Sequence, residues 1–371
     1  MTAGATMFRR SRLVESRLWR RVTPGLRLLL LACLLVGLAA ALPVLAQPVA
    51  GAAADLPTPR ADAARLDYRL QARPLAPGAW VVEGDNADFS VPNGCNIINT
   101  AFFATGAGVV VVNTGTSRRY GEQLRALIAR TTPEPVVRVL HLNLHPDYFL
   151  GNQAFADVPR AATAATRAGI AREAAAYETN LYRLCGDWMR GTEALAPDQE
   201  LEAAVRTGVL QVGQRRFELL ELQGHTESDL VLFEPQSGVL LAGGLVFVQR
   251  VPTTPHAQLG PWRASLARLA DWAAPRGVRW LVPSHGPVQA LSGGPAVAAA
   301  TQGTDRYLDW LDRHFSRWAA QGGDMNDVIR AEVPVEFRAW AAFGTEYLRN
   351  VAHLYPAYER QVMAPGRPAA R

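Results

Sequence analysis

Three expected strands that each end in a histidine loop constrain this chain most. The loops, which follow strands expected over 136–142, 217–222 and 279–282, are Asn143-Leu144-His145-Pro146-Asp147-Tyr148, Gly224-His225-Thr226 and Pro283-Ser284-His285-Gly286. Loops at strand ends are where a rigid scaffold presents its ligands. His145, Asp147, His225 and His285 carry the nitrogen and oxygen donors that Zn²⁺ prefers. One such histidine would more often be structural, but three at equivalent places predict a shared metal site.

The apolar runs predict the fold around these loops. Two strand-rich blocks, each followed by helical sequence, indicate an αββα sandwich of the α/β (α+β) class with a C-terminal helical extension. The further strands are expected over 79–82, 96–103, 109–113, 209–212, 230–233, 239–241 and 245–248. The helices are expected over 117–130, 161–189 (as two helices), 262–272 and from 302 onward.

The N-terminus has the pattern of an export signal. Residues 1–46 contain seven Arg and one Glu, an apolar run of roughly 14 residues, and Val44-Leu45-Ala46 before Gln47. We expect cleavage after Ala46 and a periplasmic location, with membrane contact only through this signal. The alternative is an uncleaved anchor, although the run is short of the ~20 residues of a membrane span.

The remaining boundaries follow composition and pattern. Residues 47–75 are expected to be an extended leader, 76–292 the sandwich domain and 293–371 the helical extension packed on it.

Charge and composition exclude several classes of function. The whole chain has a formal charge of +5, with 38 basic and 33 acidic residues. Residues 1–46 hold 7 of the basic and 1 of the acidic residues. The rest of the chain therefore has 31 basic and 32 acidic residues, a formal charge of −1. That balance argues against nucleic-acid binding. The chain has no Lys, so Schiff-base chemistry and a P-loop are excluded.

The order and spacing of these loops resemble the metallo-β-lactamase fold family. Its signature is H-x-H-x-D-H after a strand, then a G-H-T, then a G-D segment and a late S-H-G or G-H-G. Further stretches resemble one branch, the type 1 quinoprotein relay system zinc metallohydrolases. They include Gly151-Asn152-Gln153-Ala154-Phe155, Gly186-Asp187-Trp188-Met189-Arg190-Gly191 and Pro252-Thr253-Thr254-Pro255-His256. The resemblance implies a zinc-dependent hydrolase associated with quinoprotein (PQQ-type) dehydrogenases.

Three of the seven metal ligands that the resemblance implies are replaced. Asn143 and Tyr148 stand where the family has His, and Gly244 stands where it has the bridging Asp. The retained ligands are His145, Asp147, His225 and His285, and Asp147 is also the catalytic candidate. Without the bridging carboxylate, two dications would repel each other strongly. We therefore expect at most one Zn²⁺, with none as the alternative.

Two functions are the main alternatives at the level of sequence, besides a redox-linked or sulfur-handling enzyme, since this fold hosts many chemistries. One is an exported hydrolase in which metal-activated water attacks an ester-like or thioester-like bond of a small molecule. The other is a non-catalytic accessory protein, a pseudo-enzyme that binds a small molecule in the same cleft. Either could serve a quinoprotein dehydrogenase system.

Four other side chains have two interpretations each. His256 and Trp188 are candidates for substrate contact or a lid, although a surface loop and core packing are the more common fates. Cys95 and Cys185 either pair in an oxidising compartment or are buried separately as thiols.

Overall fold

The computed structural model describes residues 61–363. The expected signal peptide and its cleavage site lie outside the described residues. Within the described part, no helix is both long enough and apolar enough to cross a membrane.

Two mixed β-sheets form the centre of the molecule. The first follows chain order: β1 (Arg73–Ala76), β2 (Ala79–Val82), β3 (Thr100–Ala104), β4 (Val109–Val112), β5 (Val136–Leu140), β6 (Arg160–Ala162) and β7 (Gln199–Glu200). It is antiparallel up to β4 and parallel from β4 to β7. The second contains β8 (Val209–Val212), β9 (Arg215–Leu222), β10 (Asp229–Glu234), β11 (Val239–Leu241), β12 (Trp280–Val282) and β13 (Gln289–Ala290). Only β11 and β12 pair in parallel there.

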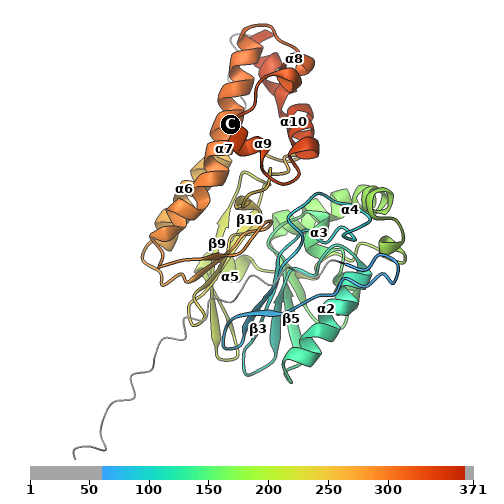
Figure 1. Cartoon of the computed structure of the whole chain (residues 1–371). Coiled ribbons are helices and arrows are strands. Elements are labelled where there is room, and N and C mark those ends of the chain that lie inside the picture. Colours follow the sequence, from blue (N-terminus) through green and yellow to red (C-terminus); the bar gives the residue numbers. More distant parts are fainter. Residues whose placement is uncertain (1–60, 364–371) are drawn as a thin grey trace, which may run out of the picture. The chain divides into compact units, whose positions relative to one another are not determined.

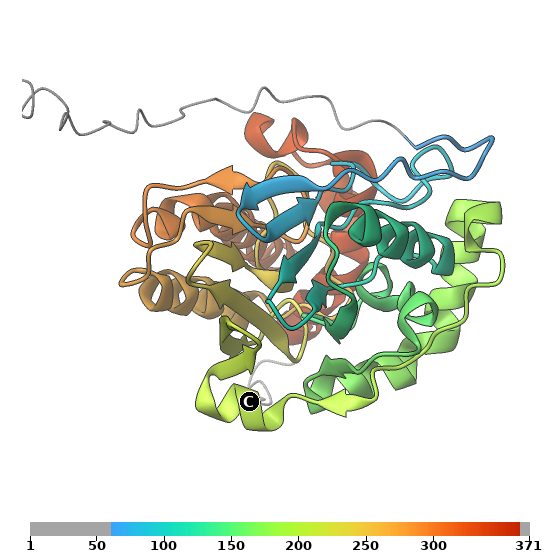
Figure 2. The ribbon, with the colours of Figure 1, turned by 90° about the horizontal axis from the view of Figure 1, so that it is seen from below.

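Helices cover the outer faces of both sheets, which confirms the expected αββα sandwich (Figures 1 and 2). On the first sheet lie α2 (Arg118–Thr131), α3 (Pro146–Phe149), η2 (Asn152–Phe155), α4 (Ala164–Cys185) and η3 (Gly186–Met189). The short helix α5 (Glu202–Thr207) precedes β8. On the second sheet lie η4 (Gly243–Leu245), α6 (Leu259–Ala273) and α7 (Ala296–Ala320).

The four valines of β4 show how the sequence builds these layers. Successive side chains of a strand point to opposite faces. Val110 and Val112 therefore pack between the sheets against residues such as Phe217, while Val109 and Val111 pack under α2. A strand that is buried on both faces must be apolar throughout, as this one is.

The C-terminal helical region contains the second half of α7 together with α8 (Met325–Arg330), α9 (Val335–Arg338) and α10 (Phe343–Met363) (Figure 1). Tyr307 and Phe315 of α7 pack in one cluster with Phe337 of α9 and Tyr347 of α10. Aromatic side chains bury large areas, so this face ties the extension to the second sheet.

Two expected elements differ from the structure. Residues 245–248 do not form a strand, because the Thr304 hydroxyl bonds the Phe247 backbone N–H and C=O at 3.1 and 2.9 Å. Only an isolated bridge joins Phe247 to His285. The segment 161–189 contains one long helix, since β6 takes its first residues and Gly186, at φ +58°, ends α4.

Candidate active-site cleft

A cavity of about 560 Å³ opens where the strand-end loops meet α4 and α10. Its walls combine apolar side chains with a few charged ones. They include Phe89, Ile97, Tyr177, Leu181, Glu173 and Arg349. Cavities of this size and composition are typical of small-molecule sites.

A disulfide between Cys95 and Cys185 links two segments that contribute residues to the cavity wall. It joins the loop that carries Phe89 and Ile97 to the end of α4, so these two parts of the cavity wall are covalently linked. Of the two interpretations of these cysteines, pairing is the one that the structure shows.

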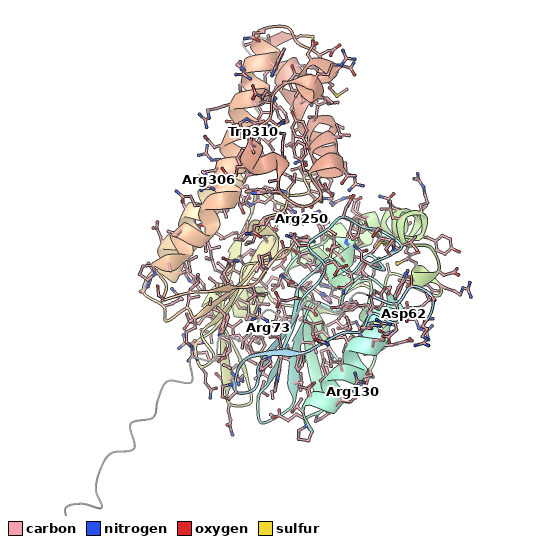
Figure 3. The ribbon with its side chains drawn as sticks, in the orientation of Figure 1. Asp62, Arg73, Arg130, Arg250, Arg306 and Trp310 are labelled. Carbon is pink, nitrogen blue, oxygen red and sulfur yellow. A yellow bond between two sulfur atoms is a disulfide. The ribbon has the colours of Figure 1, made fainter. Side chains whose placement is uncertain are left out.

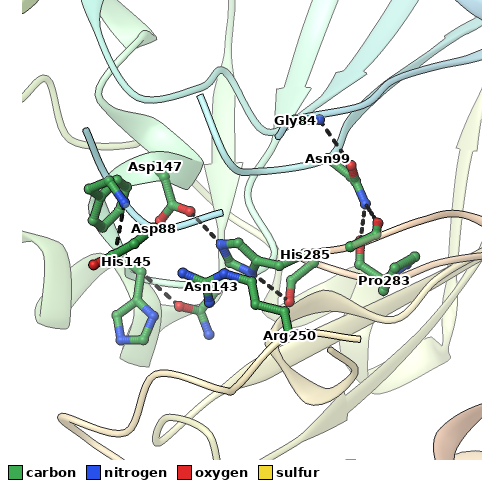
Figure 4. Close-up of polar contacts among 12 residues, drawn as sticks. Gly84, Asp88, Asn99, Asn143, His145, Asp147, Arg250, Pro283 and His285 are labelled. Atoms are coloured by element: carbon green, nitrogen blue, oxygen red, sulfur yellow. Dashed lines mark hydrogen bonds and ion pairs between the residues drawn. The ribbon is translucent and has the colours of Figure 1, made fainter. Parts of the chain in front are cut away.

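Three of the four expected ligands line the cavity, together with His256. We call His145, Asp147, His256 and His285 the open cluster. His145 is the N-cap of α3 and Asp147 lies in its first turn, because Pro146 starts this helix after the five-residue loop 141–145 that follows β5. His285 Nε2 lies 2.9 Å from the Asp147 carboxylate (Figure 4), and His145 Nε2 lies 3.1 Å from His256 Nδ1.

Burial keeps the histidines of the open cluster neutral. It lowers the pKa of His285 to about 4, with a further contribution from the Arg250 charge. Burial and the neighbouring imidazoles also lower the pKa of His145, and burial lowers that of His256. These bases are therefore unprotonated near neutral pH.

Four neighbouring polar residues of the same strand-end loops form a second group, which we call the closed cluster: Asn143, His225, Thr226 and Asp229. Asn143 Nδ2 donates to the Asp229 carboxylate at 2.5 Å, and its Oδ1 accepts from the backbone N–H of His145 at 3.0 Å. Asp229 also accepts from the Thr226 backbone N–H at 2.9 Å. Both ends of the Asn143 amide are thus used inside the protein.

His225 joins the two clusters through its ring. The ring is fully buried and lies edge-on to His145, with centroids 4.6 Å apart. Its Nδ1 is 3.4 Å from both Asn143 Nδ2 and Asp229 Oδ1. Its Nε2 has no hydrogen-bond partner among the described residues. An orphaned buried nitrogen of this kind is costly unless a ligand or water satisfies it.

The other two replaced positions leave no ligand in their place. A Cβ at Gly244 would lie 2.1 Å from His225 Nδ1 and 2.8 Å from Asp229 Oδ1, so the closed cluster fills the space that a carboxylate would need. Tyr148 is fully buried, and burial together with the Asp147 charge raises its pKa well above 10. Its hydroxyl therefore stays protonated and is a poor metal ligand.

These donors do not fit a two-metal centre. No group of three or more His, Cys, Asp or Glu side chains within residues 61–363 is arranged to hold a metal ion. The donors are instead bonded to one another, as His145 to His256 and Asp147 to His285. The assignment of His145, Asp147, His225 and His285 as ligands thus stays a prediction.

The two remaining candidates have different positions. His256 lines the cavity and contacts His145 directly. Trp188 is buried in the core, where its ring lies 4.3 Å from that of Tyr68 and its Nε1 donates to the Val91 carbonyl at 2.9 Å. An indole held in this way packs beneath the disulfide-linked loop and takes no part in the cavity wall.

With the fold and the cleft described, the family can be assigned. A family model for the Metallo-beta-lactamase superfamily matches residues 93–285, more than half of the chain. The chain belongs to this superfamily. Its members usually bind zinc. No curated protein matches the chain.

Three solved structures are similar to the chain, and the first, at a TM-score of 0.50, supports this fold. A metallo-beta-lactamase from Pontibacter korlensis has a TM-score of 0.50 and 21% identity, and the match covers 65% of this chain and 99% of that one. A metallo beta lactamase from Hirschia baltica has a TM-score of 0.47 and 20% identity, over 62% and 97% of the two chains. DIM-1 metallo-beta-lactamase, in a crystal exposed to ceftazidime, has a TM-score of 0.47 and 15% identity, and the match covers 63% of this chain and 97% of that one.

Sequence reasoning missed several residues of the cleft. Tyr177, whose hydroxyl is buried without a hydrogen-bond partner in the described structure, lines the cavity from α4. Glu346 and Arg349 reach it from α10. The helical periodicity of these segments indicated packing alone, because a sequence pattern does not show which loop a helix will face.

Proposed function

We propose that this superfamily member binds a small molecule in its cleft and does not perform two-metal hydrolysis. One observation carries the proposal: the closed cluster occupies the space of the bridging ligand at Gly244 and uses both ends of the Asn143 amide. The cavity of about 560 Å³ nevertheless has largely apolar walls. An open apolar cleft whose polar donors bond to each other favours small-molecule binding over hydrolysis.

A binding experiment tests this function. N-phenylnaphthylamine, an uncharged fluorescent probe, should bind saturably to the purified mature chain, and a chelator should not change its affinity. Ala176 faces the cavity, so Ala176→Trp should weaken probe binding about tenfold. Ala175→Trp is the matched control, since Ala175 is exposed on the same helix outside the cavity wall. Equal effects of both variants, or loss of binding with chelator, would contradict the proposal.

A second candidate is a hydrolase with one metal ion, and the orphaned His225 Nε2 favours it. That nitrogen and the adjacent His145 ring are donors of the type that zinc takes. Elemental analysis of protein purified without chelator separates the candidates. One equivalent of zinc that is lost in His225→Ala, together with ester hydrolysis, would support the hydrolase. Metal-free protein that still binds the probe would support the binding protein.

We also propose that the chain is exported to the periplasm and serves a quinoprotein dehydrogenase system there. The basic, apolar and small-residue pattern of residues 1–46 supports export, and the Cys95–Cys185 disulfide is in keeping with an oxidising compartment. Mass spectrometry of the exported protein should show an N-terminus at or near Gln47. Co-purification with a PQQ-type dehydrogenase would test the partner, and a full-length, membrane-retained product would argue against cleavage.

A further inference from the structure

A buried arginine near the open cluster has no role in the function proposed above. Arg250 is completely buried at the junction of the sandwich and the C-terminal helical region (Figure 3). The chain reaches it directly from the segment that accompanies His285, where Val248 N–H donates to the His285 carbonyl at 3.0 Å. Its backbone then bridges to Ala341 just before α10.

The guanidinium of Arg250 extends to His285 and the neighbouring acidic groups (Figure 4). Its Cζ lies 5.9 Å from the centroid of the Phe247 ring, and that ring stacks on His285 at 4.9 Å. Arg250 interacts electrostatically with Glu346, Asp88 and Asp147. The positive charge thus acts on the Asp147–His285 pair, with the Phe247 ring stacked between Arg250 and the region of His285.

The hydrogen bonds of Arg250 are incomplete. Nε donates to the Ala87 carbonyl at 2.9 Å and Nη1 to the Val251 carbonyl at 3.3 Å. Nη2 lies 3.7 Å from Glu346 Oε1, which is too far for a hydrogen bond, and has no other partner in the described structure. A guanidinium with this arrangement is retained for its charge as much as for its hydrogen bonds.

The charges around it require a cation. The carboxylates of Asp147, Asp88 and Glu346 converge on this region, and Arg349 bonds the last two at 3.0 and 2.8 Å. Without Arg250, three carboxylates would be left with one guanidinium. Uncompensated buried charge is unfavourable and burial already raises the pKa of Glu346, so Arg250 offsets negative charge that would otherwise be left in this region.

We propose that Arg250 is a built-in replacement for a metal cation: its guanidinium supplies positive charge to the region of Asp147 and His285 and thereby disfavours a divalent ion at that pair. A fixed guanidinium and a dication in the same buried region repel each other, because charges interact strongly at low dielectric. Arg250 is therefore a positioning residue that keeps Asp147 bonded to His285. This inference does not depend on which molecule the cleft binds.

The test looks for a gain of metal binding. Zinc titration, monitored by thermal unfolding, measures the affinity, and elemental analysis measures the metal content. Arg250→Met should bind zinc at least tenfold more tightly than the unmodified chain, whereas Arg250→Lys, which keeps the charge, should not. Adding Asp147→Asn to Arg250→Met should remove the gain. The matched control is Arg215→Met, because Arg215 is also buried and paired with a buried carboxylate, Glu234 at 2.6 Å, in another part of the fold.

The outcomes separate a charge replacement from an ordinary structural arginine. A folded Arg250→Met variant with no gain in zinc affinity over the unmodified chain overturns the inference, as does an equal gain in Arg215→Met. If Arg250→Met does not fold in the presence of chelator, it should be refolded with zinc. Recovery with zinc in this variant and not in Arg215→Met supports the inference, and failure to recover overturns it.

Discussion

The closed and open clusters lie side by side but have become different kinds of structure. In the closed cluster, Asn143 and Asp229 bond to each other and to the backbone, and none of its four members lines the cavity. In the open cluster all four members line it: His145 contacts His256, and Asp147 contacts His285, whose other ring nitrogen lies 3.0 Å from the Ser284 hydroxyl. The two clusters therefore differ in access: the closed cluster is part of the core, while the open cluster lines the cavity.

The largest expected effect is at Gly244, where the closed cluster leaves no space. Gly244→Ala should lower the free energy of unfolding by about 3 kcal/mol, because its Cβ would meet a buried imidazole at 2.1 Å. Urea unfolding measures this loss. Gly260→Ala is the control, since nothing lies within 4 Å of that position, and it should be neutral or slightly stabilising. A tolerated Gly244→Ala would show that the closed cluster is not rigid.

A pair of carboxylate substitutions compares the two clusters directly. Asp229→Asn should cost about 2.5 kcal/mol, because an amide at 229 turns a donor toward the Asn143 amide or the Thr226 N–H. Asp147→Asn should cost less than about 1 kcal/mol, since Asp147 accepts mainly from His285 and faces the cavity. Equal losses in the free energy of unfolding, measured by chemical denaturation, would contradict the distinction between the closed and the open cluster.

Acid should act on the open cluster with a somewhat smaller effect. The pKa of His285 is about 4 when folded, compared with 6.5 ordinarily, so between these values the unfolded chain binds a proton that the folded chain does not. Stability should thus fall by about 2 kcal/mol between pH 7 and pH 5 on account of this residue, and level off below pH 4. The slope should be smaller in His285→Gln, and an unchanged slope would assign the effect to other buried histidines such as His141.

Much of the fold could be predicted from local pattern. The fully apolar sequence of β4, the single apolar face of α7 around Tyr307 and Phe315, and the strand-end positions of the histidines all follow from local pattern. The strand expected at 245–248 failed for a reason that lies far along the chain, since the Thr304 hydroxyl from α7 satisfies the Phe247 backbone. No window of sequence around Phe247 contains that information.

The sequence by itself determined the superfamily and the residue types at the strand ends, because residue identity at a strand end is a local property. Only the tertiary structure decided which of those residues bond to one another. Asp229 satisfies Asn143 across 86 positions, His256 reaches His145 across 111, and Asp147 pairs with a residue 138 positions away. Hydrogen bonds and charge compensation depend on distance in space, which the order of residues along the chain does not give.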